Sequence, residues 1–204
     1  MKKQFAFCLI LCFALFVLSC EKDPPPARQI FYMDNEFKDN SFFKPGTWWV
    51  YQLDTLTEDS VAVISSQFIL QEPDTADYSW QQSELEYSSS YYNDTILLKG
   101  DFLHSASVFY LTQHDSSEIL NFFSLKPPGY TLEISPALQM KYRELKDTVI
   151  NGQPFSGVRI FENLVTPQHL HLPREIWYAP NIGVIRKVLF NGEEWQLNRY
   201  QIVQ

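Results

Sequence analysis

Apolar and polar residues alternate over much of this chain beyond residue 30, and this period of two predicts β-strands. The clearest early example is residues 47–53 (TWWVYQL), which follow the turn Lys44-Pro45-Gly46. Apolar side chains point to both sides of this segment, which predicts a strand covered on both faces. The same reasoning predicts strands over residues 59–70, 95–98, 107–113 and 118–125, with a polar and aromatic alternation over 78–92.

The last third of the chain has the clearest pattern, a three-stranded meander over residues 174–178, 183–190 and 194–203. In its last strand Trp195 and Leu197 share one phase of the alternation, whereas Tyr200 and Ile202 have the opposite phase. A β-bulge near residues 198–199 would produce this change of phase. Because bulges bend sheets, we expect the sheet to curve and begin to enclose a space.

Two segments carry helical signals. Residues 30–38 fit either a short helix or an arm packed on the sheet. Ser135-Pro136 has the form of a helix N-cap followed by proline in the first turn, which predicts one turn of helix. A strand is then predicted over residues 141–150, leading into Asn151-Gly152, a strong hairpin signal.

The first residues have a different pattern. An unbroken apolar run of 14 residues, Phe5 to Leu18, follows Lys2 and Lys3, as in the charged and apolar regions of a secretory signal. This run is shorter than the roughly 18 apolar residues that indicate a membrane-spanning helix. A plain membrane anchor and a cleaved signal without lipid remain the alternatives.

The signal ends in Val17-Leu18-Ser19-Cys20, which resembles the lipobox of bacterial lipoproteins. The resemblance implies cleavage before Cys20, a thioether-linked diacylglycerol on its sulfur and acylation of the new amine. We therefore expect residues 1–19 to be a signal peptide, 20–29 a proline-rich tether and 30–204 one β-rich domain. The expected location is the outer membrane, at its periplasmic face or at the cell surface, held by the acyl chains.

Composition narrows the classes of partner. After removal of residues 1–19, 14 basic residues face 24 acidic ones, a formal charge of −10. This acidic balance argues against nucleic acid and against docking on anionic lipid by charge. Since Cys8, Cys12 and Cys20 are the only cysteines, the domain has no disulfide and must be stabilised by packing, for which 16% aromatic residues provide the material.

Four short stretches, KPGTWWVYQLD, INGQPFSGVRIF, WYAPNIGVIRKV and EEWQLNRYQI, together resemble a pattern of small lipoproteins of Gram-negative bacteria. The resemblance implies an all-β, mainly antiparallel fold with at most short helices. Its curved sheet would form a half-barrel or open barrel, as in periplasmic lipoprotein carriers. It implies no catalytic residues.

Signals for chemistry are weak. His169 and His171 have a metal-like spacing, and on a strand both would share a face with Glu175. Pro167 and Pro173 bracket the pair, so we interpret these residues as surface-loop histidines. The chain has no Gly-x-Ser-x-Gly elbow, phosphate loop or dinucleotide fingerprint. We therefore predict a non-catalytic protein without a metal or cofactor.

Two binding hypotheses follow from the aromatic residues. In the first, the curved sheet forms an apolar pocket for an apolar or amphiphilic ligand such as a lipid, with Trp48 and Trp49 among the wall residues. In the second, the domain is a surface-displayed interaction or glycan-binding module. Its aromatic face would include Trp80, Tyr87 and Tyr92, although packing in the core is the alternative role for these rings.

A tripeptide of aspartate, a hydroxyl residue and an aliphatic residue recurs five times, where about one match is expected by chance. It resembles the acceptor of a general O-glycosylation system of exported proteins in some Gram-negative bacteria. The resemblance makes candidate acceptors of the five hydroxyls, Thr55, Ser60, Thr75, Thr95 and Thr148. Alternatively, these tripeptides simply mark the entrances of strands.

The lipobox leads to a direct test. Cys20→Ala should leave the protein without fatty acid and release it from membranes, because several acyl chains are needed for stable attachment. Metabolic labelling with a fatty acid, followed by membrane fractionation, measures both effects. Label that persists on the Cys20→Ala protein would contradict the assignment, and Cys12→Ala is the matched control that should keep its label.

Overall fold

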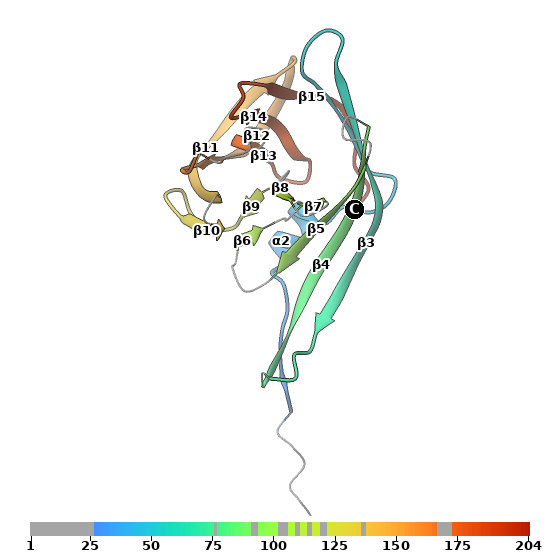
Figure 1. Ribbon diagram of the computed structural model, residues 1–204, viewed down its shortest axis with the longest axis vertical. Helices are drawn as coiled ribbons and strands as arrows, with labels where there is room; N and C mark the ends of the chain where they lie inside the picture. Colours follow the sequence, from blue (N-terminus) through green and yellow to red (C-terminus); the bar gives the residue numbers. More distant parts are fainter. Residues whose placement is uncertain are drawn as a thin grey trace, which may run out of the picture.

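The computed structural model describes residues 27–75, 77–90, 94–101, 106–108, 111–113, 116–118, 122–135, 138–166 and 173–204. One large curved sheet dominates it, in the order β1-β4-β3-β2-β15-β14-β13-β12-β11-β10, with β5 also paired to β4 (Figure 1). The strands of this sheet are β1 (Gln29–Phe31), β2 (Trp48–Gln52), β3 (Glu58–Gln71), β4 (Tyr78–Ser89), β5 (Asp94–Asp101), β10 (Thr131–Ser135), β11 (Leu138–Ile150), β12 (Gln153–Asn163), β13 (Pro173–Ala179), β14 (Gly183–Leu189) and β15 (Glu194–Gln201).

The sheet is mixed and open. β1 runs parallel to β4, whereas the other pairings are antiparallel. The curved sheet does not close into a barrel, and one short helix accompanies it. The prediction of an all-β fold with a curved, open sheet is confirmed.

The details of the C-terminal meander are also confirmed. β13, β14 and β15 follow one another in the sheet, and the pairing of β15 with β2 shifts by one residue between Leu197 and Arg199. This shift is the predicted bulge. The hairpin of β11 and β12 turns at Asn151 and Gly152, whose φ angles of 49° and 78° suit a turn with two left-handed residues.

Other expectations were wrong in detail. Where one turn of helix was predicted, β10 extends to Ser135 and β11 starts at Leu138, and Pro136 lies outside the described residues. Pairing of β11 with both β10 and β12 outweighs the local helical signal there. The single strands predicted over 107–113 and 118–125 are instead four short ones: β6 (Ala106–Val108) pairs with β9 (Phe122–Ser124), and β7 (Leu111–Gln113) pairs with β8 (Ser116–Glu118).

Residues 30–38 combine the two structures considered for them. β1 lies along β4, and its pairing starts at Gln29, one residue before the expected start of the domain. Helix α2 (Asn35–Ser41) follows at once, where the Asp34 side chain caps the helix by accepting from the Glu36 amide at 2.7 Å.

Helix α2 fills the concave side of the sheet. Its Phe37 is 4% exposed and faces β5, where a Cβ on Gly100 would lie 3.3 Å from the Phe37 ring. At the other side of the concavity, the Tyr178 hydroxyl of β13 donates to the Asn40 carbonyl at 2.8 Å. Arg159 of β12 also forms a 3.2 Å ion pair with Glu36. The helix therefore joins strands from opposite halves of the curved sheet.

An arm extends from this body (Figure 1). We define the arm as the paired residues 29–31 of β1, 68–71 of β3 and 78–83 of β4. In Figure 1 it is the lower part of β3 and β4, and the first described residues of the chain lie beside its tip. The tip carries the exposed Glu72, Asp74 and Asp77, and Arg28 donates to the Pro73 carbonyl there at 3.1 Å.

Burial in the meander makes a quantitative prediction. Leu189 is 3% exposed, so Leu189→Ala should lower the free energy of unfolding by about 2–5 kcal/mol. The matched control is Leu145→Ala on β11, because Leu145 is 56% exposed and should change stability by no more than about 0.5 kcal/mol. Urea unfolding of both variants measures the difference, and equal effects would contradict the assignment of Leu189 to the core.

Candidate functional site

Three aromatic rings gather on the outer face of the arm. Even-numbered side chains of β4 point to this face, and odd-numbered ones such as Ser83 and Leu85 are buried on the inner face. The Phe31 ring of β1 meets Tyr78 edge to face at 5.7 Å, and Tyr78 lies 5.9 Å from Trp80. We name Phe31, Tyr78 and Trp80 the aromatic platform.

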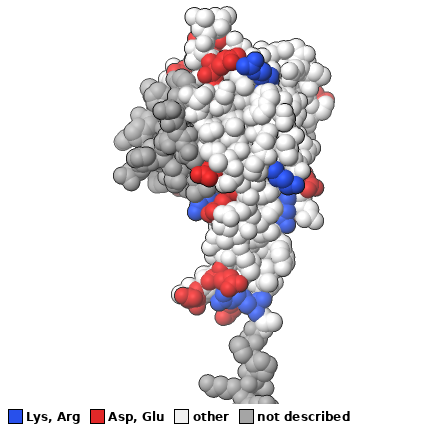
Figure 2. Space-filling view, turned by 90° about the vertical axis from the view of Figure 1, so that its right-hand side faces the viewer, with Lys and Arg blue, Asp and Glu red and all other residues white. Residues whose placement is uncertain are grey.

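Polar side chains surround the platform. Gln71 of β3 pairs with Trp80, so the two side chains share the outer face. Farther along β4, Gln82 donates to Glu84 at 3.5 Å, and Lys99 forms a 3.1 Å ion pair with Glu84. Figure 2 shows charged side chains on this side of the molecule in separate groups at the top, at mid-height and at the lower end, with uncharged surface between them.

The inner face of the arm is apolar and partly open. Ile30, Phe68 and Leu70 are 41%, 38% and 41% exposed. Phe42 stacks on Phe68 with ring centroids 4.0 Å apart, and the Lys38 ammonium lies 5.5 Å from the Phe68 ring. This surface continues the core outward because Phe42 packs against buried core residues as well.

The aromatic residues predicted as binding residues separate into different environments. Trp49 is 3% exposed, packs on Phe43 and donates from Nε1 to the Ile182 carbonyl at 2.6 Å. Tyr87 is 4% exposed, and burial raises the pKa of its hydroxyl far above the usual range. Both belong to the core, which corrects their placement among the binding residues. Trp80 lies on the platform and Trp48 is half-buried on β2, whereas Tyr92 is outside the described residues.

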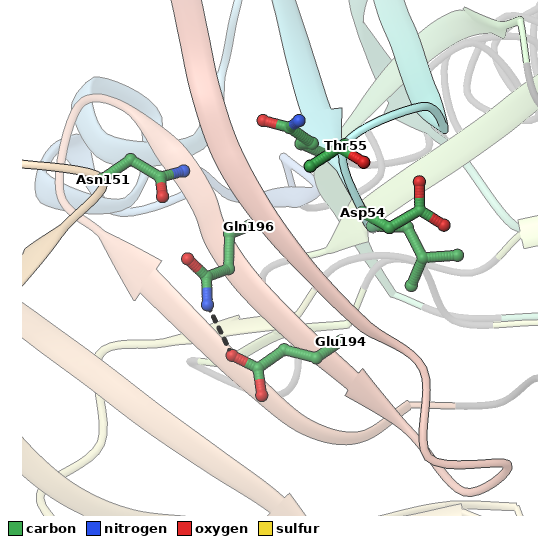
Figure 3. A pocket seen from close by; sticks show the side chains of 7 residues that line it. Asp54, Thr55, Asn151, Glu194 and Gln196 are labelled. Carbon is green, nitrogen blue, oxygen red and sulfur yellow. Dashed lines mark hydrogen bonds between the residues drawn. The ribbon is translucent and has the colours of Figure 1, made fainter.

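A second candidate site is a polar pocket of about 310 Å³ at the other end of the domain. Asn151 reaches into it from the β11–β12 turn, Glu194 and Gln196 from β15, and Asp54 and Thr55 from the turn after β2 (Figure 3). Gln52 and Leu53 complete the lining. The pocket exists because the sheet curls until the β11–β12 turn meets β15, where Asn151 Nδ2 donates to the Leu197 carbonyl at 3.0 Å.

Arg186 holds one wall of this pocket in place. Its guanidinium donates from Nε and one terminal nitrogen to the two oxygens of Glu194, at 2.8 and 2.9 Å. The Gln196 amide donates to the same carboxylate at 2.6 Å (Figure 3). The hydrogen bonds from Arg186, with a smaller contribution from Gln196, hold the pKa of Glu194 below its ordinary value of 4.5, although partial burial opposes this shift.

The hydroxyls of the five aspartate tripeptides differ in access. Thr55, Ser60 and Thr75 are exposed, at the turn after β2, on β3 and at the tip of the arm, and Thr148 is half-buried on β11. Thr95 lies on β5, where its side chain is not among those described. Cys20 and the two histidines His169 and His171 lie outside the described residues.

Comparison with known proteins does not place this chain: no model of a protein family, no curated protein and no solved structure matches it. Within the described residues, no helix has the length and apolarity needed to span a membrane. In that same part of the chain, no three His, Cys, Asp or Glu side chains gather as a metal site would require.

The sequence predicted one residue of the aromatic platform, Trp80, as a binding residue, and it did not predict the polar pocket. Trp80 and Tyr87 are seven residues apart, and this odd spacing already places them on opposite faces of one strand. The pocket joins segments about 100 and 40 residues apart in the chain, and no local pattern in the sequence marks them as neighbours.

The clamp on Glu194 makes stability depend on pH. Because its folded-state pKa is lowered, its ionised form stabilises the fold above pH 4.5, and this contribution is lost as pH falls through the folded-state pKa. Glu194→Gln should therefore destabilise the protein at pH 7 and have a smaller effect at pH 3.5, as measured by urea unfolding. Glu162→Gln is the control, since no ion pair links Glu162 to another described residue. A pH-independent difference for Glu194→Gln would contradict the clamp.

Proposed function

We propose that this protein is a membrane-anchored, non-catalytic binding module that holds a saccharide on the aromatic platform. The proposal rests on two ring contacts on the outward face of the sheet. Phe31 meets Tyr78 edge to face, and Tyr78 meets Trp80 in a tilted arrangement. Tyr78 is 37% exposed, and Trp80 and Phe31 are partly exposed, so the rings present apolar area to solvent.

The chemistry of the platform suits a sugar ring. A pyranose has an apolar face of C–H groups, which packs on an aromatic ring, and a rim of hydroxyls, which needs hydrogen-bonding partners. Gln71 and Gln82 beside the platform offer amides that both donate and accept. A rigid sheet holds these groups with little loss of entropy on binding.

The place of the chain's N-terminal segment agrees with a role near a membrane. Residues 20–28 extend about 30 Å at most if they adopt polyproline II, at about 3.1 Å per residue. Attachment through Cys20 would therefore keep the arm close to the bilayer. The exposed Glu72, Asp74 and Asp77 at the arm tip oppose direct contact with anionic lipid, which favours a saccharide of the envelope as ligand.

One observation favours a second candidate, an amphiphile bound on the inner face of the arm. Ile30, Phe68 and Leu70 offer a partly open apolar surface there, and the Lys38 ammonium beside Phe68 suits an anionic headgroup. The interior beyond this surface is occupied by α2, Phe43 and Trp49, so an acyl chain would lie along the arm.

Modification of exposed hydroxyls is a further part of the proposal. Thr55, Ser60 and Thr75 are exposed and thus accessible to a glycosyltransferase, and Thr75 lies at the arm tip. A glycan there would add solvated bulk and take no part in binding.

Mutation of the platform tests the proposed function. The full chain, purified from membranes, should be retarded in affinity electrophoresis by at least one neutral polysaccharide in a panel of glucans, mannans and galactans. Trp80→Ala should weaken that binding at least about tenfold, because a stacked ring supplies more than about 1.4 kcal/mol at a binding hot spot.

Trp48→Ala is the matched control. Trp48 shares the outer face with Ser88 through the β2–β3–β4 pairing, about 27 Å along β4 from Trp80 at about 3.4 Å per residue. Its removal should leave affinity unchanged. Binding that survives Trp80→Ala would contradict the platform. Phospholipid that co-purifies in native mass spectrometry and is lost from Leu70→Ser would support the amphiphile instead.

A further inference from the structure

The polar pocket of Gln52, Leu53, Asp54, Thr55, Asn151, Glu194 and Gln196 has features of a second, separate binding site. It lies where the β11–β12 turn, β15 and the turn after β2 converge, whereas the platform lies on the arm formed by β1, β3 and β4 (Figures 1 and 3). Its volume of about 310 Å³ is at the lower end of the range of small-molecule sites.

Two amide side chains of the pocket are oriented by hydrogen bonds at its wall. Asn151 uses its NH₂ group to donate to the Leu197 carbonyl at 3.0 Å, and Gln196 uses its NH₂ group to donate to Glu194 at 2.6 Å. In each amide the carbonyl oxygen points away from the NH₂ group. Asn151 Oδ1 and Gln196 Oε1 are therefore left as acceptors, and no described residue donates to either.

The rest of the lining adds acceptors and negative charge. Asp54 Oδ1 accepts from the amides of Leu56 and Thr57, at 2.7 and 2.8 Å, so the carboxylate is fixed at the rim. These backbone hydrogen bonds favour the ionised form and lower the pKa of Asp54 from its ordinary value of 3.8. Glu194 forms the second carboxylate, and Arg186 lies behind it.

The balance of donors and acceptors selects the ligand. The Thr55 hydroxyl and the Gln52 amide are the donors of the lining that have no partner among the described residues, and they also accept. The two oriented carbonyls and the Asp54 carboxylate only accept, whereas both oxygens of Glu194 already accept from Arg186. A ligand that donates several hydrogen bonds and carries positive charge satisfies these groups, and the chain's net charge of −8 attracts it.

We propose that this pocket binds an organic cation, a guanidinium or primary ammonium group on a short aliphatic stem. The head donates to Asn151 Oδ1 and Gln196 Oε1 on one side of the pocket, and the Asp54 carboxylate on the other side adds negative charge (Figure 3). Leu53 supplies an apolar wall for the stem. Such a group is presented by an arginine or lysine side chain and by small diamines.

Titration with agmatine, which has both a guanidinium and an ammonium group, tests the proposal. In ¹H–¹⁵N spectra of the full chain in neutral detergent, agmatine should cause saturable shifts at residues 52–55, 151 and 194–196, and added salt should weaken them. Gln196→Leu and Asn151→Gly should each weaken the apparent affinity about tenfold, since each removes one oriented carbonyl. Glycine retains the left-handed backbone of Asn151, whose φ is 49°.

Matched controls show whether agmatine binds in this pocket or elsewhere on the protein. Gln201→Leu alters a glutamine of the same strand outside the pocket and should leave agmatine binding unchanged, as should the platform variant Trp80→Ala. Glycerol, a neutral polyol, should cause no saturable shift. The proposal is overturned if agmatine shifts nothing, if glycerol or calcium chloride saturates the same residues at lower concentration, or if Gln196→Leu binds agmatine as well as the parent protein.

Discussion

Packing of helix α2 against two distant parts of the same sheet is the interaction on which this fold depends. An open sheet that curves must bury its concave face, because no closing strand covers it. Phe37 packs against β5 while Asn40 and Glu36 contact β13 and β12, so one short helix joins both ends of the curve. Burial of a side chain such as Phe37 contributes about 1.5–3 kcal/mol. A Cβ at position 100 would lie 3.3 Å from the Phe37 ring and 2.7 Å from the Ser83 hydroxyl, so glycine there favours the close approach of the helix.

The same strand serves both the core and the platform because its two faces have different neighbours. Leu85 and Tyr87 point inward in β4, where the body of the domain covers them. Nearer the arm tip the inward residues are Ser79, Gln81 and Ser83, and the small Ser83 side chain lies beside Gly100, where α2 packs. Even-numbered side chains point outward along the whole of β4, so the rings of Tyr78 and Trp80 lie next to solvent.

The sequence predicts what depends on neighbours in the chain. The alternation located the meander of β13, β14 and β15, the opposite phases of Trp195 and Tyr200 predicted the bulge, and Asn151-Gly152 predicted its hairpin. Local helical signals failed where strand pairing decides, as at Ser135, which pairs with Leu138 between β10 and β11. Local signals also did not predict that Trp49 and Tyr87 face a filled interior. Helix α2 helps to fill that interior, and the pattern of its own segment fitted either a helix or an arm. The pocket depends on the curl of the entire sheet, which no short window contains.

The direction of β1 has a mechanical consequence. The chain enters β1 at the arm tip and runs parallel to β4, so tension on the N-terminal segment acts along the strand axis. The three residue pairs of this ladder are then loaded together in shear, and they cannot open one at a time like a zipper. Immediately behind β1 lies α2, so force that breaks the ladder next pulls on the helix that fills the concave face. The short parallel strand thus bears a pulling force on the N-terminal segment before that force reaches the interior of the domain.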